Sequence, residues 1–196
     1  MMNVGHVAKS LIQGMPTLLT GGIPSERAGD ERLTFNRIFA SDVIGVQSPA
    51  FGPGEPIPSH YSAEEGTSVS PPLSWLGVPS GARSIAIVVE DPDAPTPNPF
   101  VHWLAYNIPP EAGGLPEGWS GSPDDPPGLE GKNSTLKLGY IDAAPPKGDL
   151  PHHYHFCVFA VSKMLELDAG AGRNALVEAL KPRVIGKGRL VGTYQR

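Results

Sequence analysis

Two short runs of the sequence are apolar at nearly every position and rich in β-branched and aromatic residues. They are SIAIVVE, residues 84–90, and HYHFCVFAV, residues 153–161. Successive side chains of a strand point to opposite faces of the sheet, so a strand with apolar residues at both sets of positions is buried on both faces. We therefore predict that these runs are central strands of a sheet that is covered on both sides.

Glycine and proline divide the rest of the chain into short segments. The 196 residues include 24 glycines and 23 prolines, spread in small clusters without a fixed period. This pattern favours short strands and turns over long helices. Residues 101–108 predict a further strand with His102, Leu104 and Tyr106 on one face, and residues 169–181 predict the clearest helix.

The sum of these segments, with a closing strand in residues 188–196, is a mostly-β fold. We expect a two-sheet antiparallel β-sandwich with one or two peripheral helices. Residues 46–196 would form this domain, and residues 1–45 an N-terminal extension that is partly helical or mobile. Within the extension, residues 4–13 have the spacing of a short amphipathic helix.

Charge and cysteine content exclude several classes of protein. A net charge of −5 and a pI near 5.6 leave no basic stripe for nucleic acid. The single cysteine, Cys157, allows no intrachain disulfide and is compatible with a reducing cytoplasm, where we place the protein. The first 22 residues are too interrupted by polar residues, glycine and proline for a secretion signal or a transmembrane segment.

The candidate site begins at EDPDAPTPNPFVHW, residues 90–103. Asp91 ends a predicted central strand, and Pro92 and Pro95 stiffen the loop that follows. A stiff loop holds a carboxylate at the end of a sheet with little entropy left to lose when a ligand binds. The plain alternative is an Asx turn at the end of a strand.

His102 opens the next strand. A histidine alone in an apolar strand is usually a core residue that is hydrogen-bonded to the backbone. If the two strands are neighbours, however, Asp91 meets His102 at one end of the sheet and favours its protonated form. Such a pair can hold a phosphate through charge-assisted hydrogen bonds.

The PHHYHF motif adds more candidate side chains. The two-residue period of a strand places His152 and Tyr154 on one face and His153 and His155 on the other, so one face carries the site. A zinc site made of His153, His155 and His102 is an alternative, because imidazole is the commonest nitrogen ligand of metals. No HExxH motif or cysteine pair supports it, and we predict no metal.

Familiar catalytic motifs are absent from the sequence. It has no GxSxG elbow, no P-loop and no GxGxxG motif between a strand and a helix, so we predict no catalytic residue and no cofactor. The rival interpretation is a hydrolase in which Asp91 and His102 form an acid–base pair that acts on an ester or a phosphoester.

Several motifs in fixed order resemble one known family. They are SPPLSW, GVPSGARSIAIVVEDPDAP, VHWLAYNIP, GKN, GY, PPKG and HHYHFCVFAV, and the likeness runs from about Gln47 to Arg196. Together they are similar to the phosphatidylethanolamine-binding protein family, in particular to its bacterial Raf-kinase-inhibitor-like branch. The resemblance implies a β-sandwich with a small pocket at one end that takes phosphate-like or carboxylate anions, including phospholipid headgroups.

The resemblance also implies a set of ligand-binding residues. These are Asp91, Asp93, Ala94, Pro95, His102, Pro145, Pro146, His152 and Tyr154. Two positions depart from the family pattern. Where the family commonly has arginine this chain has His153, which would make the charge at the rim depend on pH, and Ala144 stands where bacterial relatives often have cysteine. The first 45 residues have no counterpart that we can place.

The leading expectation is therefore a binding protein without enzymatic activity. Its pocket would hold a small anion such as phosphate or the phosphoethanolamine headgroup, with Asp91 orienting His102 and keeping it charged. Binding would then weaken above about pH 7, near the ordinary pKa of histidine of about 6.5. The resemblance adds a protein kinase or a protease as a partner. An inhibitor that acts through its surface stays open as a third class, and the protein could form a homodimer.

Overall fold

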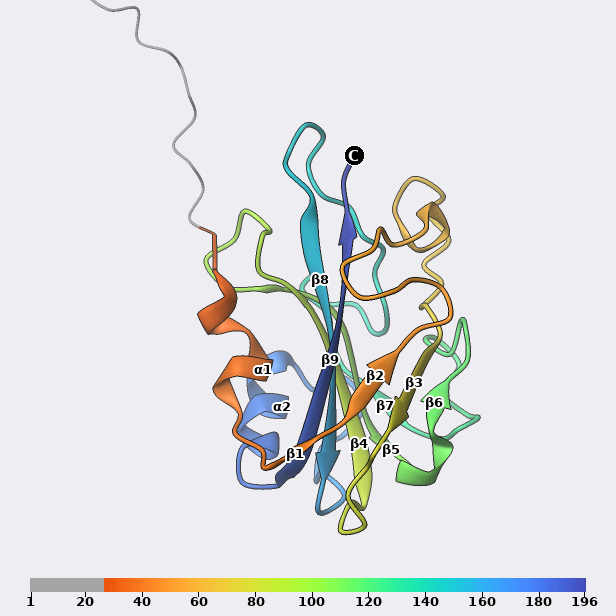
Figure 1. The fold of residues 1–196 in the computed structure, drawn as a ribbon, viewed down its shortest axis with the longest axis vertical. Helices are drawn as coiled ribbons and strands as arrows, with labels where there is room; N and C mark the ends of the chain where they lie inside the picture. Colours follow the sequence, from red (N-terminus) through yellow and green to blue (C-terminus); the bar gives the residue numbers. More distant parts are fainter. Residues whose placement is uncertain (1–26) are drawn as a thin grey trace, which may run out of the picture.

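The computed structural model describes residues 27–196. Two β-sheets face each other, and helices cover the outer face of the larger sheet (Figure 1). The six-stranded sheet has the order β1-β9-β8-β4-β5-β7, and the three-stranded sheet has the order β2-β3-β6. The strands are β1 (Asp42–Val43), β2 (Gly45–Gln47), β3 (Leu73–Leu76), β4 (Ser84–Asp91), β5 (Phe100–Ile108), β6 (Gly114–Leu115), β7 (Leu129–Glu130), β8 (His152–Val161) and β9 (Val184–Tyr194). The predicted two-sheet sandwich is confirmed.

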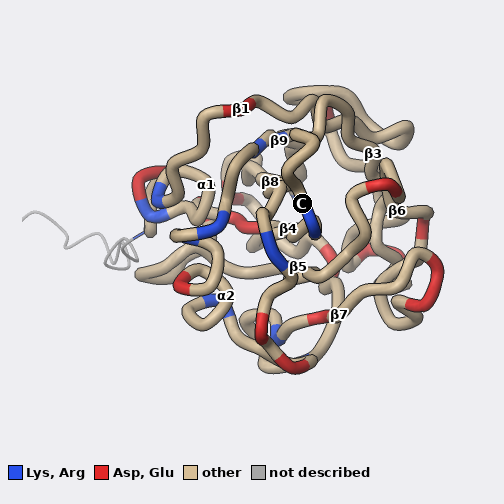
Figure 2. Tube along the Cα trace, turned by 90° about the horizontal axis from the view of Figure 1, so that it is seen from below, with Lys and Arg blue, Asp and Glu red and all other residues tan. Residues whose placement is uncertain are grey.

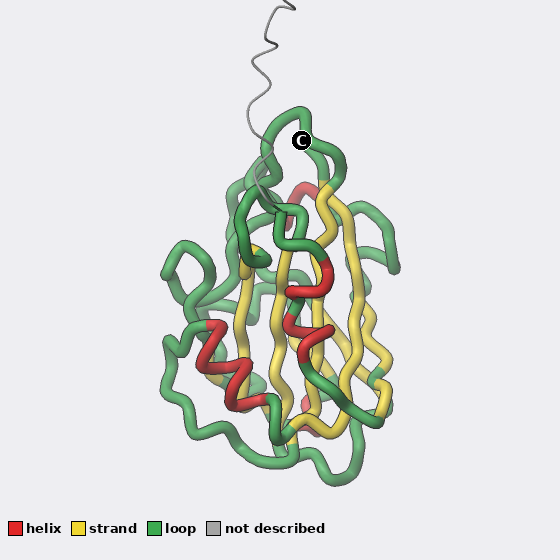
Figure 3. Tube along the Cα trace, turned by 90° about the vertical axis from the view of Figure 1, so that its left-hand side faces the viewer, coloured by secondary structure: helices red, strands yellow, loops and turns green. Residues whose placement is uncertain are grey.

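The helices are short. They are α1 (Thr34–Arg37) and α2 (Arg173–Leu180), with the 3₁₀ turns η1 (Asp30–Arg32), η2 (Ser59–Tyr61) and η3 (Pro110–Ala112). Both α1 and α2 lie across the outer face of the larger sheet (Figure 3). α2 falls within the predicted helix of residues 169–181 and begins after Gly172, whose backbone is extended. The helix predicted over residues 4–13 lies outside the described residues.

The two predicted central strands are neighbours in the middle of the larger sheet. β4 pairs antiparallel with β8 on one side and with β5 on the other. All eight positions of β4 are buried. This explains the continuous apolar run, because one face of β4 packs against the smaller sheet and the other against the helices.

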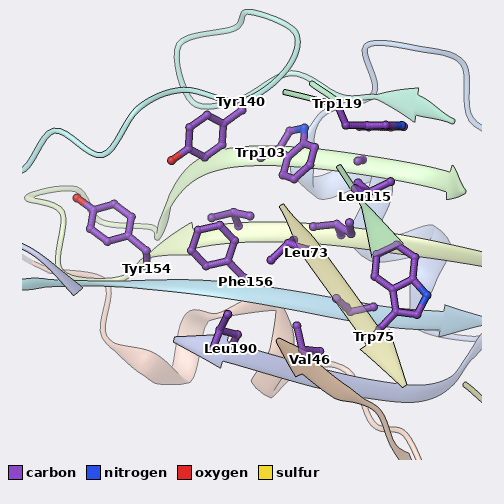
Figure 4. Packing of buried hydrophobic residues seen from close by; sticks show 14 of the residues in the cluster. Val46, Leu73, Trp75, Trp103, Leu115, Trp119, Tyr140, Tyr154, Phe156 and Leu190 are labelled. Atoms are coloured by element: carbon purple, nitrogen blue, oxygen red, sulfur yellow. The ribbon is translucent and has the colours of Figure 1, made fainter. Parts of the chain in front are cut away.

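Two apolar clusters hold these layers together. The intersheet cluster includes Val89, Trp103 and Phe156 and fills the space between the sheets (Figure 4). The outer cluster, which includes Leu104 and Leu176, lies between the larger sheet and the helices. Successive side chains of a strand point to opposite faces of the sheet, so neighbouring residues of one strand belong to different clusters.

A β-bulge changes the direction of His102. Val89 is opposite Trp103 and Glu90 is opposite Val101, so His102 is an extra residue in β5. His102 consequently leaves the face of Leu104 and Tyr106 and contacts Tyr154 edge to face, with 5.0 Å between the ring centroids. The prediction that His102 shares a face with Leu104 and Tyr106 is wrong, because strict alternation does not anticipate a bulge.

Charged residues are distributed unevenly around the sandwich. The side that carries β3 and β6 shows acidic residues without lysine or arginine, whereas both signs occur around α1 and α2 (Figure 2). Residues 47–82 contain no lysine or arginine at all. The smaller sheet therefore offers no basic surface of the kind that nucleic acid requires.

Candidate ligand pocket

A pocket of about 360 Å³ lies at the end of the sandwich where β4 ends and β5 and β8 begin. It is lined by Ala63, Asp91, Ala94, Pro95, Thr96, Phe100, His102, Ile141, Asp142, Ala144, Pro145, Pro146, His152 and Tyr154. Every side chain that the sequence analysis assigned to ligand binding is part of this lining except Asp93. The volume is that of a site for a small molecule.

The Asp91 carboxylate is fully occupied by groups of the protein. Its Oδ1 atom accepts hydrogen bonds from the backbone N–H groups of Asp93 and Ala94, at 2.8 and 3.1 Å. This is the Asx turn that we considered as the plain alternative. Its Oδ2 atom lies 2.8 Å from Nδ1 of His152. Asp91 therefore fixes the loop and His152, and it has no oxygen left without a donor.

His102 is not the partner of Asp91. Its Nδ1–H donates instead to the carbonyl oxygen of Ile141, at 2.8 Å. Burial lowers the pKa of His102, and the Asp91 carboxylate opposes this only in part. The expectation that Asp91 orients His102 and holds it charged is therefore wrong. His102 is a neutral ring at pH 7, and its Nε2 atom has no hydrogen-bond partner among residues 27–196.

His152 lies between two carboxylates. Nδ1 is 2.8 Å from Asp91, Nε2 is 3.5 Å from Oδ2 of Asp149, and the side chain is almost completely buried. An imidazole can donate to both carboxylates only when it is protonated on both nitrogens. Arg27 also bonds Asp149, at 3.0 Å. Both nitrogens of His152 therefore serve the wall of the pocket, so its predicted role as a donor to an anion has less support than that of Tyr154.

Tyr154 carries a buried hydroxyl group without a partner in the described part of the chain. Burial, with a smaller effect of the Asp91 charge, raises the pKa of Tyr154, so the phenol keeps its proton. Tyr154 and Tyr140 lie at one end of the intersheet cluster, and Trp75, whose Nε1 atom is also unpartnered, lies toward the other end (Figure 4). An unpaired buried hydroxyl costs about 1–3 kcal/mol, which a ligand oxygen would recover.

Asp142 is a lining residue that the sequence analysis missed. It is 8% exposed, and its Oδ2 atom accepts bonds from the backbone N–H and the hydroxyl of Ser68, at 3.2 and 3.3 Å. Its Oδ1 atom has no partner within residues 27–196. The only sign of Asp142 in the sequence is that it is the acidic residue of the stretch YIDAAPP. Loops have no regular period, so the sequence does not indicate where its side chain points.

The last two residues of the chain hold the wall that contains the two prolines. Nε of Arg196 donates to the carbonyl oxygen of Pro145, and Nε2 of Gln195 donates to that of Asp149, both at 2.8 Å. The backbone N–H of Gly148 returns a bond to Arg196, at 3.1 Å. These contacts fix the loop, so bonds within the protein hold this wall of the pocket.

Asp93 and the remaining histidines lie outside the lining. Oδ2 of Asp93 accepts bonds from the backbone N–H and Nδ1 of His153, at 2.9 and 2.7 Å. Arg189 lies 3.4 Å from Nδ1 of His155. In the part of the chain that the structure describes, no group of three histidine, cysteine, aspartate or glutamate side chains could hold a metal ion. The zinc site that we considered is not assembled there.

The fold and the pocket define a class of protein: a β-sandwich with a preformed site for a small ligand at one end. Comparison with known families gives the particular family. The model of the family described as "Phosphatidylethanolamine-binding protein" matches residues 47–195 of this chain. The chain belongs to the phosphatidylethanolamine-binding protein family.

Individual relatives agree with this assignment. A UPF0098 protein of Pyrococcus horikoshii is 37% identical over 200 residues, which cover 100% of this chain and 94% of that protein. The first 45 residues, for which we could place no counterpart, thus lie within this alignment. The crystal structure of YbcL from E. coli, described as a member of the mammalian PEBP family, has a TM-score of 0.73 and 32% identity, covering 78% of this chain and 98% of that one. A candidate lipoprotein of Mycobacterium tuberculosis, LppC, is 35% identical over 80% of this chain and 74% of its own length.

Proposed function

We propose that the pocket binds a small phosphate- or carboxylate-bearing ligand, either free or as the headgroup of a phospholipid. The observation that carries this proposal is the buried Tyr154 hydroxyl, which belongs to a residue of the pocket lining and has no hydrogen-bond partner within residues 27–196. It donates to one oxygen of the ligand, and Nε2 of His102, which becomes protonated when the anion binds, donates to another. A phosphate or carboxylate group, whose oxygens accept both bonds, matches this pair.

Proton uptake should accompany binding. The His102 ring is neutral in the free protein because burial lowers its pKa. A bound anion favours the charged form of a nearby ring and so raises this pKa again. A ligand that raises the pKa of a group binds more weakly as the pH rises. The direction that we predicted from the sequence is unchanged, but its cause is protonation on binding rather than a charge that is present beforehand.

Calorimetric titration tests the proposal. Phosphoethanolamine and inorganic phosphate are titrated into the full chain at pH 6 and at pH 8, with tighter binding expected at pH 6. Tyr154→Phe removes only the hydroxyl, and we expect about a tenfold loss of affinity. Tyr106→Phe is the matched control, because that hydroxyl bonds the Asp168 carbonyl on the other side of the sheet. Equal affinity in Tyr154→Phe and the parent chain would overturn the proposal.

Vesicles distinguish a free ligand from a lipid headgroup. Phe100, Ile141 and the prolines give the pocket an apolar wall that can contact the first carbons of either ligand. Flotation of the protein with vesicles of phosphatidylethanolamine in phosphatidylcholine, lost in Tyr154→Phe, would identify the headgroup. Binding of soluble phosphoethanolamine without flotation would identify the free molecule.

The hydrolase alternative receives no support from the geometry. It requires Asp91 to orient His102, but Asp91 bonds His152 and His102 bonds the Ile141 carbonyl. A screen of ester and phosphoester substrates with the parent chain and His102→Ala decides the matter. Turnover that is lost in the variant would favour the enzyme over the binding protein.

We extend the proposal to a regulatory role in the cytoplasm, on a protein kinase or a protease, as the resemblance to Raf-kinase-inhibitor-like proteins implies. The buried free thiol of Cys157 is compatible with that compartment.

No helix among residues 27–196 has the length and hydropathy needed to cross a membrane. Light scattering tests the homodimer, and cell fractionation tests the compartment.

A further inference from the structure

A second cavity, of about 450 Å³, lies on the outer side of the larger sheet, and we call it the outer cavity. Its lining comes from the start of β5 and the residues before it, from the loop that follows β7, and from α1 and the start of α2. It shares no residue with the ligand pocket. Phe100 and His102 line the pocket, whereas Pro99 and Val101 line the outer cavity. One segment of the chain therefore separates two distinct sites.

The charged side chains of the outer cavity are all cationic. They are Arg37, Lys132 and Arg173. Arg173 is occupied, because its Nε atom donates to Glu90 and its Nη2 atom to the carbonyl oxygen of Arg32. The side chains of Arg37 and Lys132 have no hydrogen-bond or ion-pair partner among residues 27–196. Two positive charges of the lining are therefore uncompensated.

The carboxylate nearest in sequence to the start of α2 does not supply this compensation. Glu178 is bonded by Lys181, at 2.6 Å, and this bond lowers the pKa of Glu178, with a smaller effect of Arg37. The lining itself contains no aspartate or glutamate. Like charges around one cavity repel each other, and a bound anion relieves that repulsion.

Neutral donors of the lining add to the two cations. The Ser134 oxygen accepts the backbone N–H of Val101, at 2.8 Å, so its position is fixed while its own proton has no acceptor in the described part of the chain. The N–H groups of Arg173 and Asn174, in the first turn of α2, also have no partner there. A phosphate group accepts several such bonds at once.

We infer that the outer cavity is a second binding site, for a soluble phosphate ester that carries two negative charges. Arg37 and Lys132 balance these charges, and the Ser134 hydroxyl donates to a phosphate oxygen. Pro99 and Val101 give the carbon part of the ester an apolar surface. The volume is that of a site for a small molecule rather than for a bare ion. This site does not depend on the ligand pocket or on its proposed function.

The two sites should respond to pH in opposite directions. The lining of the outer cavity contains no histidine, and lysine and arginine stay charged from pH 5.5 to pH 7.5. A phosphate monoester gains its second charge near pH 6, so we expect binding to be about fourfold tighter at pH 7.5 than at pH 5.5. Binding in the ligand pocket should weaken over the same range.

Nuclear magnetic resonance of the full chain tests the inference, with phenyl phosphate as the probe. Phenyl phosphate should shift the amide signals of Ser134 and Ala175 in the parent chain, and these shifts should persist in Tyr154→Phe. Lys132→Gln should weaken this binding about tenfold. Lys137→Gln is the matched control, because Lys137 is an exposed residue of the same loop outside the lining, and it should lose less than twofold.

The outcomes separate the two sites. If phenyl phosphate shifts only the signals of His102 and Tyr154, the proposed function stands and the inference is overturned. If it shifts only those of Ser134 and Ala175, the outer cavity is a site and the proposed function fails. Equal losses in Lys132→Gln and Lys137→Gln would show attraction to surface charge alone and would also overturn the inference. So would binding at Ser134 that weakens from pH 5.5 to pH 7.5.

Discussion

Glu90 and Asp91 are neighbours in β4, and they show two different uses of a buried carboxylate. Glu90 points to the outer face, is fully buried and has a donor at each oxygen. Its partners are the N–H and hydroxyl of Thr34, at 2.8 and 2.9 Å, and Nε of Arg173. These bonds join α1 and α2 to the sheet. The Glu90 site is therefore complete without a ligand.

Asp91, one residue further along β4, belongs to the pocket, where several polar groups lack a hydrogen-bond partner. The Tyr154 hydroxyl, Oδ1 of Asp142 and Nε2 of His102 have no partner in the described residues. Buried polar groups are usually hydrogen-bonded, so a group that is not paired needs a reason. The two sites therefore differ in one respect: the groups around Glu90 are saturated and hold the layers together, whereas the pocket has unsaturated groups that the proposed function assigns to a ligand.

The largest expected effect comes from breaking the saturated site. Glu90→Gln keeps the shape of the side chain but removes its charge, which leaves Arg173 without its carboxylate and changes an acceptor into a donor facing Thr34. Removing one partner of a buried ion pair costs about 3 kcal/mol or more. Urea unfolding of the variant should show this loss, while ligand affinity under conditions that keep it folded should change less than twofold.

Glu178→Gln is the control for this prediction. Glu178 is exposed and pairs with Lys181 within α2, and such surface pairs contribute little to stability because water screens them. If both glutamate variants lose the same small amount of stability, Glu90 does not anchor the helices.

A smaller effect concerns pH and the same outer face. His155 is opposite Glu90 in β8, and burial together with Arg189 lowers its pKa to about 4. The unfolded chain takes up this proton near pH 6.5, so the contribution to stability is complete above that pH and is lost as the pH falls toward 4. Between pH 7 and pH 5 we expect a loss of about 2 kcal/mol that His155→Gln abolishes. An unchanged slope in His155→Gln would contradict the prediction.

The sequence predicted the strands because continuous apolar runs are a local pattern, and these runs identified β4 and β8. The residues that the resemblance implied, Tyr154 and the two prolines among them, lie in the lining of one pocket, whereas their binding of a ligand stays a prediction. Pairing at long range was not predictable. Thr34 meets Glu90 across 56 residues, and neither residue has a pattern that indicates the other.

The errors at the site have two physical causes. The bulge that redirects His102 depends on the register between β4 and β5, and a single-strand period contains no information about register. The partner of Asp91 depends on which histidine the folded loop brings within 2.8 Å, and the chain offers both His102 and His152 at suitable positions. Asp142 was missed because loops have no periodicity.

The smallest expected effect is the sharpest test of the comparison. Tyr154→Phe removes a hydroxyl that has no partner in the described part of the chain, so the folded protein loses no hydrogen bond. We expect its free energy of unfolding to stay within about 0.5 kcal/mol of the parent value or to rise, because an unpaired buried hydroxyl is itself unfavourable. Tyr106→Phe breaks a bond to the Asp168 carbonyl and should lose about 1 kcal/mol. Urea unfolding of both variants checks this order. A Tyr154→Phe protein that is clearly less stable than Tyr106→Phe would show that the Tyr154 hydroxyl stabilises the fold, and the distinction between the saturated site and the pocket would fail.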